Sequence, residues 1–196
     1  ASLTDGLGKI GSEFEILSSN KVGPTIAEDI KTSAVWSIIF SLIVIFFYIF
    51  VRFRKWQFGL GALAALFHDV LLILGLFSLF YDIMPFSLEI DQAFIAAILT
   101  VVGYSINDTV VVFDRIREQL TLHPKAPLFE SMNKALNDTI SRTLITSATT
   151  LMVILILFIF GGEIIRGFSF ALLIGILVGT YSSIFISSPV VADLSK

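Results

Sequence analysis

Five long apolar segments constrain the fold of this chain more than any other feature. They lie near residues 33–51, 57–80, 93–112, 143–160 and 167–186, and clusters of charged residues separate them. Each segment is long enough to cross the hydrocarbon core of a bilayer as an α-helix. The sequence therefore predicts an all-α membrane protein, with a transmembrane domain of five spans over residues 31–190.

The composition agrees with a membrane location. Hydrophobic residues make up 56% of the chain and charged residues 15%, and the mean hydropathy is +0.91. These values lie outside the range of soluble globular proteins. The chain has no Cys, which excludes disulfides and Cys-based metal or redox sites, and its net charge of -3 does not favour nucleic acid as a partner.

The basic residues predict the orientation of the spans. The connections after the first and third spans are basic, whereas the connection after the second is acidic; the residues concerned are Arg52, Arg54, Lys55, Arg115, Arg117, Lys125 and Lys134 on one side and Asp82, Glu89 and Asp91 on the other. Loops rich in Lys and Arg face the cytoplasm. We therefore expect the N-terminus outside, and residues 191–196 as a cytoplasmic tail.

The segment before the first span has a different character. Residues 1–30 are polar and contain one alternating stretch, 13–19, that predicts a single strand. So few residues cannot build a core of their own. We expect them to be the remnant of a periplasmic domain, and the chain to be the back part of a longer protein in which another span precedes that domain.

Residues 128–141 lie between the third and fourth spans and show helical spacing of apolar residues. One interpretation is an amphipathic helix along the cytoplasmic interface. An extension of the fourth span fits the pattern equally well.

A second pattern concerns helix packing. Gly167, Ala171, Gly175 and Gly179 recur at intervals of four, so small residues line one face of the fifth span. Small residues let two membrane helices approach closely. We expect this face to be buried against another helix.

Charged residues within the spans indicate a functional site. They are Asp69, which follows His68, Asp108, and Arg142. A charge at the centre of a membrane helix costs about 2.5–3.5 kcal/mol, so such groups usually face a bundle interior and have partners. Asp108 is expected about 7–8 Å from the cytoplasmic end of its span, with Arg142 at a similar depth and Asp69 deeper, at about 15–18 Å.

Two interpretations of Asp108 and Arg142 stay open at this stage. A buried carboxylate near an arginine can act as a proton switch, or the pair can be a static link between two helices. His68 can share a proton relay or serve as a packing residue. Asn107 is placed to form a hydrogen bond across a helix interface.

Four stretches carry a resemblance to a known family. They are "VVGYSINDTVVVFDRIRE" at 101–118, "LFHDVLLILGLFSL" at 66–79, "LNDTISRTLITSATTL" at 136–151 and "SSNKVGPTI" at 18–26. The chain resembles the SecF half of the bacterial SecDF translocation factors, which are related to the resistance-nodulation-division exporters. In that family a further span and an outside domain precede the part matched here.

The resemblance implies a function and a set of partners. A SecF-type protein uses the proton gradient, or a sodium gradient, to promote translocation of an exported polypeptide through the SecYEG channel in the bacterial plasma (inner) membrane. Its partner is SecD, separate or fused. By the same resemblance, Asp108 is the ion-coupling aspartate, Arg142 is its arginine partner, and Asp69 matches the family's "HD" position.

Two other functions remain as alternatives. One is a half-unit of a resistance-nodulation-division exporter for small molecules or lipids, and the other is a structural scaffold for the channel without ion flux. We find no phosphate-binding loop, metal-ligand cluster or nucleophile constellation in the sequence. We therefore expect no enzymatic activity, no metal and no cofactor.

Overall fold

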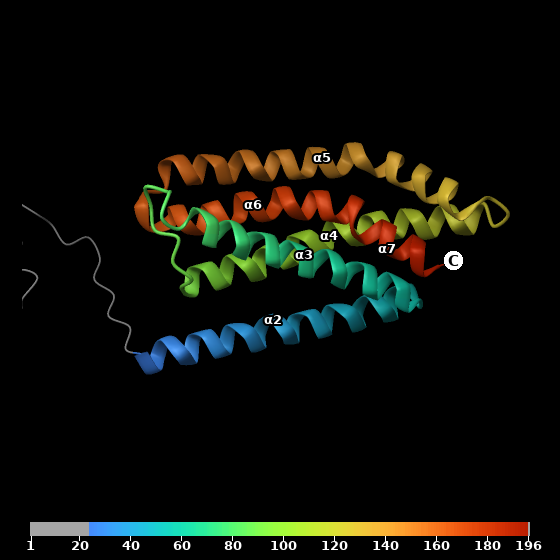
Figure 1. Ribbon diagram of the computed structural model, residues 1–196. Coiled ribbons are helices and arrows are strands. Elements are labelled where there is room, and N and C mark those ends of the chain that lie inside the picture. Colours follow the sequence, from blue (N-terminus) through green and yellow to red (C-terminus); the bar gives the residue numbers. More distant parts are fainter. Residues whose placement is uncertain (1–23, 196) are drawn as a thin grey trace, which may run out of the picture.

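The computed structural model describes residues 24–195, which are helical almost throughout (Figure 1). The helices are α2 (Pro24–Phe53), α3 (Trp56–Phe80), α4 (Gln92–Leu122), α5 (Leu128–Phe160), α6 (Glu163–Phe185) and α7 (Ser187–Leu194). Five candidate spans in this part of the chain are long and apolar enough to cross a membrane. The predicted all-α membrane fold is confirmed; the strand expected at 13–19 lies outside the described residues.

Short corners with specific backbone conformations join the helices. Arg54, directly after α2, has a φ of 57° and its N–H donates to the carbonyl of Phe50 at 2.8 Å. Gly162, before α6, has a φ of 76°. Left-handed residues of this kind end helices and turn the chain. At the start of α4, the Asp91 carboxylate accepts a hydrogen bond from the N–H of Phe94 at 2.8 Å and caps the helix.

Two helices are longer than the sequence indicated. α4 continues past residue 112 to Leu122, and α5 is one helix from Leu128 to Phe160. Residues 128–141 are therefore the first part of α5, which corresponds to the extension of the fourth span rather than to a separate interfacial helix. The reason lies in packing, because Met132 and Ala135 are buried against Phe113 and Ile116 of the extended α4.

The end of the chain also differs from the expectation of a tail at 191–196. α6 ends at Phe185 and the chain continues as α7, in which Val191 and Ala192 are buried. Pro189 explains the break, since it has no N–H and its ring conflicts with the carbonyl four residues before it. Gly61 of α3 then allows α7 to approach, because a Cβ at Gly61 would lie 2.6 Å from the Val191 side chain.

The helices form a bundle with α2 and α5 at its outer edges and α3, α4 and α6 between them (Figure 1). In the most apolar window of each span, 56% of the residues are buried in the C-terminal span, against 6% in the first and 17% in the span formed by α5. The surfaces of α2 and α5 are therefore available to lipid or to another protein.

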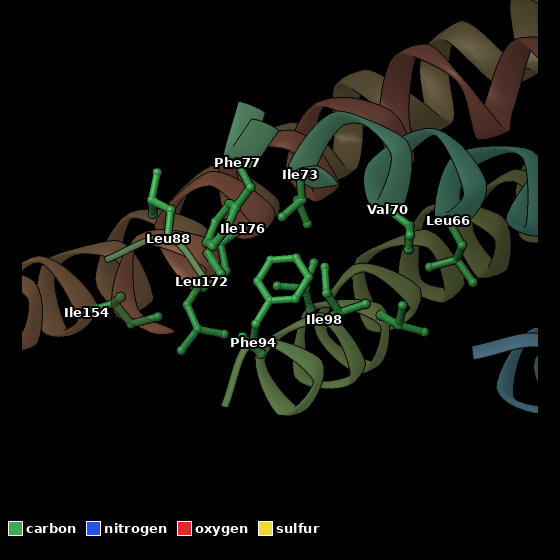
Figure 2. Packing of buried hydrophobic residues seen from close by; sticks show 14 of the residues in the cluster. Leu66, Val70, Ile73, Phe77, Leu88, Phe94, Ile98, Ile154, Leu172 and Ile176 are labelled. Atoms are coloured by element: carbon green, nitrogen blue, oxygen red, sulfur yellow. The ribbon is translucent and has the colours of Figure 1, made fainter. Parts of the chain in front are cut away.

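Two apolar clusters fill the bundle along its length. The first contains Leu66, Ile73, Phe94, Ile98 and Leu172, among others, and Figure 2 shows how α3, α4, α5 and α6 contribute to it. The second contains Phe53, Phe58, Phe113, Met132 and Val191, among others. It lies at what we call the basic end of the bundle, where α2 and α4 end and α3 and α5 begin.

Candidate functional site

A layer of polar side chains lies between the two apolar clusters. We define this polar layer by its buried members, which come from all the helices except α2: Asp69, Ser105, Asp108, Thr109, Thr143, Ser147, Thr180, Ser182, Ser183, Ser187 and Ser188. Asp69 and Asp108 are the buried charged residues in the described part of the chain. All the other members are Ser or Thr, whose hydroxyl groups can donate and accept hydrogen bonds.

Asp69 is completely buried and well supplied with hydrogen-bond donors. Its Oδ2 accepts hydrogen bonds from the hydroxyls of Ser105, at 2.7 Å, and Ser182, at 2.9 Å. Its Oδ1 lies 3.2 Å from Nδ1 of His68. These contacts join α3, α4 and α6 around one carboxyl group, so Asp69 holds the three helices together.

Asp108 is almost as deeply buried, with 4% of its surface exposed, but it has a single long contact. Its Oδ2 lies 3.5 Å from the hydroxyl of Ser147. That hydroxyl also lies 2.6 Å from Oγ1 of Thr180, which donates to the carbonyl of Ile176 at 2.7 Å. Ser147 has one hydrogen to give, so it serves either Asp108 or Thr180. Asp108 therefore keeps most of its acceptor capacity unused.

Arg142 does not form an ion pair with Asp108 in this structure. The ion pairs within residues 24–195 do not include these two side chains, although the charge of Arg142 is close enough to act on the carboxyl group. Arg142 and Asn107 both have exposed side chains, and neither side chain makes a hydrogen bond to another described residue. Asn107 lies on α4 and Arg142 on α5.

The difference in depth between the Asp69 and Asp108 carboxylates is smaller than the sequence predicted. Asp69 is bonded to Ser105, which precedes Asp108 by one helical turn on α4. The two carboxylates are thus separated by about 5 Å along the bundle, at 1.5 Å per residue. They belong to one layer, but different hydroxyl groups contact them.

The small residues of α6 permit this arrangement. Ala171, Gly175 and Gly179 are buried, and a Cβ at Gly175 would overlap the side chain of Val101 on α4. A Cβ at Gly179 would lie 3.0 Å from the Ser105 side chain. The remaining member, Gly167, lies beside the loop between α3 and α4, where a Cβ would be 2.7 Å from the carbonyl oxygen of Ser87.

Ion pairs connect the helices at the basic end. Arg52 pairs with Asp114 at 2.9 Å, which joins α2 to α4. Arg115 donates from Nε to Asp138 at 3.1 Å, and the side-chain amide of Gln119 donates to the same carboxylate at 3.2 Å. These contacts hold α5 to α4 outside the apolar clusters. Among the described residues, no group of three His, Asp or Glu side chains gathers as a metal site requires.

Four hydroxyl residues around the two carboxylates were not predicted from the sequence. Ser105 and Ser182 contact Asp69, Ser147 contacts Asp108, and Thr180 contacts Ser147. The available signal was the richness in hydroxyl residues of "TSATT" at 146–150 and "TYSS" at 180–183 within apolar spans.

Comparison with known families identifies the chain. The model of the family described as "Protein export membrane protein SecD/SecF, C-terminal" matches residues 3–196. The chain belongs to the SecD/SecF C-terminal family. This confirms the resemblance carried by the four sequence stretches. The polar layer is therefore a feature of a SecD/SecF membrane domain.

Individual members of the SecD/SecF family are similar over nearly all of the chain. The protein translocase subunit SecF of Rhodothermus marinus is 62% identical over 180 residues, which cover 92% of this chain and 58% of that protein. The corresponding protein of Rhodobacter capsulatus is 46% identical, covering 94% of this chain and 54% of that protein. The chain thus spans little more than half the length of these curated relatives.

A solved structure shows the same arrangement of helices. The crystal structure of SecDF in its super-membrane-facing form matches with a TM-score of 0.81 and 38% sequence identity. The match covers 99% of this chain and 26% of that one. The fold described above is therefore that of one part of a SecDF membrane region.

Proposed function

We propose that this chain is the membrane part of a SecF-type translocase subunit, which uses an ion gradient to promote the export of polypeptides. Its partners are a SecD-type half, separate or fused, and the SecYEG channel. Relatives that carry the name protein translocase subunit, at up to 62% identity, support export of polypeptides over the small-molecule exporter alternative. The basic end faces the cytoplasm of a bacterial cell in this proposal, in accord with its Arg and Lys residues.

The observation that carries the proposal is the contrast between the two buried carboxylates. An ion carrier must bind and release its ion, so it needs acceptor capacity that the protein does not fill. Asp108 has this property, with one contact at 3.5 Å. Asp69 does not, because two hydroxyls and His68 surround it. We assign the carrier role to Asp108 and a positioning role to Asp69.

Protonation of Asp108 changes the hydrogen-bond pattern around it. The ionised carboxylate only accepts, and Ser147 is its nearest donor. The protonated carboxyl can donate to Ser147, which then gives its own hydrogen to Thr180. A change of charge on α4 is thereby felt on α5 and α6. A sodium ion would use the same carboxylate and hydroxyl oxygens.

Arg142 contributes a fixed positive charge to this site. An arginine does not lose its proton in a protein, so its charge disfavours a cation at Asp108 and promotes release. The membrane potential supplies about 2.3 kcal/mol for each charge that crosses 100 mV. This energy is sufficient to shift a two-state helix arrangement by more than tenfold.

Exposed polar side chains on α4 and α5 support the proposal of a SecD-type partner. Asn107 and Arg142 lie within the membrane-spanning part of the chain, yet both are exposed, and neither side chain makes a hydrogen bond or an ion pair with a described residue. Polar groups at this depth normally face protein or a water-filled space rather than lipid. We propose that the SecD-type half covers this surface and completes the surroundings of Asp108.

The test is translocation of an export substrate into vesicles that hold the complete SecDF-type complex and an imposed ion gradient. Asp108→Asn keeps the shape of the side chain but cannot ionise, so both the gradient-dependent stimulation and the ion conduction should fall to background. Arg142→Lys should reduce the stimulation as well, because it loses the planar guanidinium.

The matched control is Asp82→Asn, which removes an exposed carboxylate from the loop between α3 and α4. It should leave stimulation unchanged. If Asp108→Asn keeps the full gradient-dependent stimulation, Asp108 is not the carrier and the layer is a static link between helices.

A further inference from the structure

A groove separates α2 from α3 at the outer edge of the bundle. It has a volume of about 640 Å³ and is lined by apolar side chains alone, which include Ile39, Ile43, Phe47, Leu60, Ala64 and Phe67. The two helices approach each other at the end of the groove nearest the corner that connects them, where a Cβ at Gly59 would lie 2.7 Å from the Phe46 ring. From that point they diverge, as Figure 1 shows.

Two positive charges stand beside the end of the groove that is nearest the corner between α2 and α3. Arg54 and Lys55 form this corner; both are exposed, and neither is in an ion pair within the described part of the chain. Leu60, which lines the groove, is five residues from Lys55, or about 7.5 Å along the helix. Trp56, at the start of α3, is 48% exposed, as is usual for Trp at a membrane interface.

We propose that this groove binds an anionic phospholipid, with an acyl chain between α2 and α3 and the phosphate beside Arg54 and Lys55. The apolar lining matches the chain, and the two unpaired charges match the headgroup. Basic residues at the membrane surface attract anionic lipids in this way. Arg52 is not required, because Asp114 already neutralises it.

The charges beside the groove favour an anionic lipid over an apolar helix of another protein. The groove runs from Ile39 to Phe47, which is about 12 Å along α2. Its apolar lining suits a hydrocarbon chain or an apolar helix alike. Arg54 and Lys55 at its end have no acidic partner within the described residues, and the phosphate of a lipid supplies one.

The first experiment measures lipid retention by native mass spectrometry on the full-length subunit in its complex. Phosphatidylglycerol, which is anionic, should be retained more strongly than phosphatidylcholine. Arg54→Gln and Lys55→Gln should each weaken phosphatidylglycerol binding about fivefold and leave phosphatidylcholine unchanged. Lys125→Gln, an equivalent exposed change in the connection between α4 and α5, should have no effect.

The second experiment tests the groove itself. Ala64→Trp should fill the groove and reduce the retention of both lipids. If the Ala64→Trp protein does not fold, Arg54→Gln and Lys55→Gln still test the proposal. A photoreactive label on Ala64→Cys should form an adduct with the mass of a phospholipid. The proposal is overturned by equal retention of the two lipids, by an effect of Lys125→Gln as large as that of Arg54→Gln, or by labelling of protein in place of lipid.

Discussion

At the scale of single residues, Asp69 and Asp108 are both buried in the polar layer but differ in the hydroxyl groups that reach them. Two serine hydroxyls donate to one oxygen of Asp69, whereas Asp108 competes with Thr180 for the hydrogen of Ser147. Burial alone therefore does not distinguish the proposed carrier, Asp108, from the proposed positioning residue, Asp69. The number of hydrogen-bond donors is what differs between them.

The role of Asp69 can be measured through its donors. Replacing Ser105 and Ser182 together by Ala leaves its Oδ2 without a hydrogen bond in a buried site. We expect this double change to lower the free energy of unfolding by about 1–3 kcal/mol, the usual cost of an unsatisfied buried group. In the background of Asp69→Leu the same change should cost little, because no acceptor is left to satisfy.

The measurement is denaturant-induced unfolding of the detergent-solubilised complex, followed by loss of helical signal. Thr149→Ala serves as the control, since this exposed hydroxyl bonds only to carbonyls of its own helix. An equal cost of the serine changes with and without Asp69 would show that the serines act through packing rather than through the carboxylate.

The charged residues within the spans could be predicted from the sequence, but their hydroxyl partners could not. Asp69, Asp108 and Arg142 were identifiable because a charge within an apolar run is costly and therefore visible. Their partners were not, because a hydroxyl in a membrane helix usually bonds to its own backbone. Ser182 reaches Asp69 across 113 residues of sequence, and only the packing of α6 on α3 and α4 brings them together.

At the scale of elements, the contact between α4 and α6 depends on small residues. Gly175→Ala places a methyl group against Val101, so α6 must move away from α4. We expect a loss of about 1–3 kcal/mol in stability, typical of an overpacked interior. Gly75→Ala is the matched control, because a Cβ there meets no atom within 4 Å; it should be neutral or slightly stabilising, since Ala favours helices.

Thermal unfolding of the purified protein measures these effects. A further variant combines Gly175→Ala with Val101→Ala. The second change removes the methyl groups that cause the overlap, so it should restore much of the lost stability. Equal effects of Gly175→Ala and Gly75→Ala would contradict the close approach of α4 and α6.

The packing face of α6 could be predicted from the sequence, whereas the ends of α4 and α5 could not. The four-residue spacing on α6 indicated a packing face because it depends on helical periodicity alone. The limits of α4 and α5 were less accessible, because their polar extensions are stabilised by contacts with each other, such as Arg115 with Asp138. Similarly, the burial of Val191 depends on the space beside Gly61, which is 130 residues earlier in the chain.

At the scale of the whole molecule, the exposed polar surface of α4 and α5 predicts dependence on a partner. The full-length subunit should unfold at a lower temperature alone than in complex with its SecD-type half, because binding stabilises the folded state. Asn107→Leu combined with Arg142→Leu should shrink this difference, since apolar side chains suit lipid. Scanning calorimetry of the subunit alone and in the complex measures this difference in unfolding temperature. Equal unfolding temperatures would contradict a shared interface.

The polar layer also has a consequence for the order in which the chain enters the membrane during synthesis. Thr180 and Ser183 bond to carbonyls of their own helix, so each can pass into lipid already satisfied. The carboxyl of Asp69 cannot, and its second hydroxyl donor emerges 113 residues later. We therefore expect Asp69 to lack its second hydroxyl donor while the earlier helices insert. The hydrogen bonds of the layer are complete only after α6 has inserted.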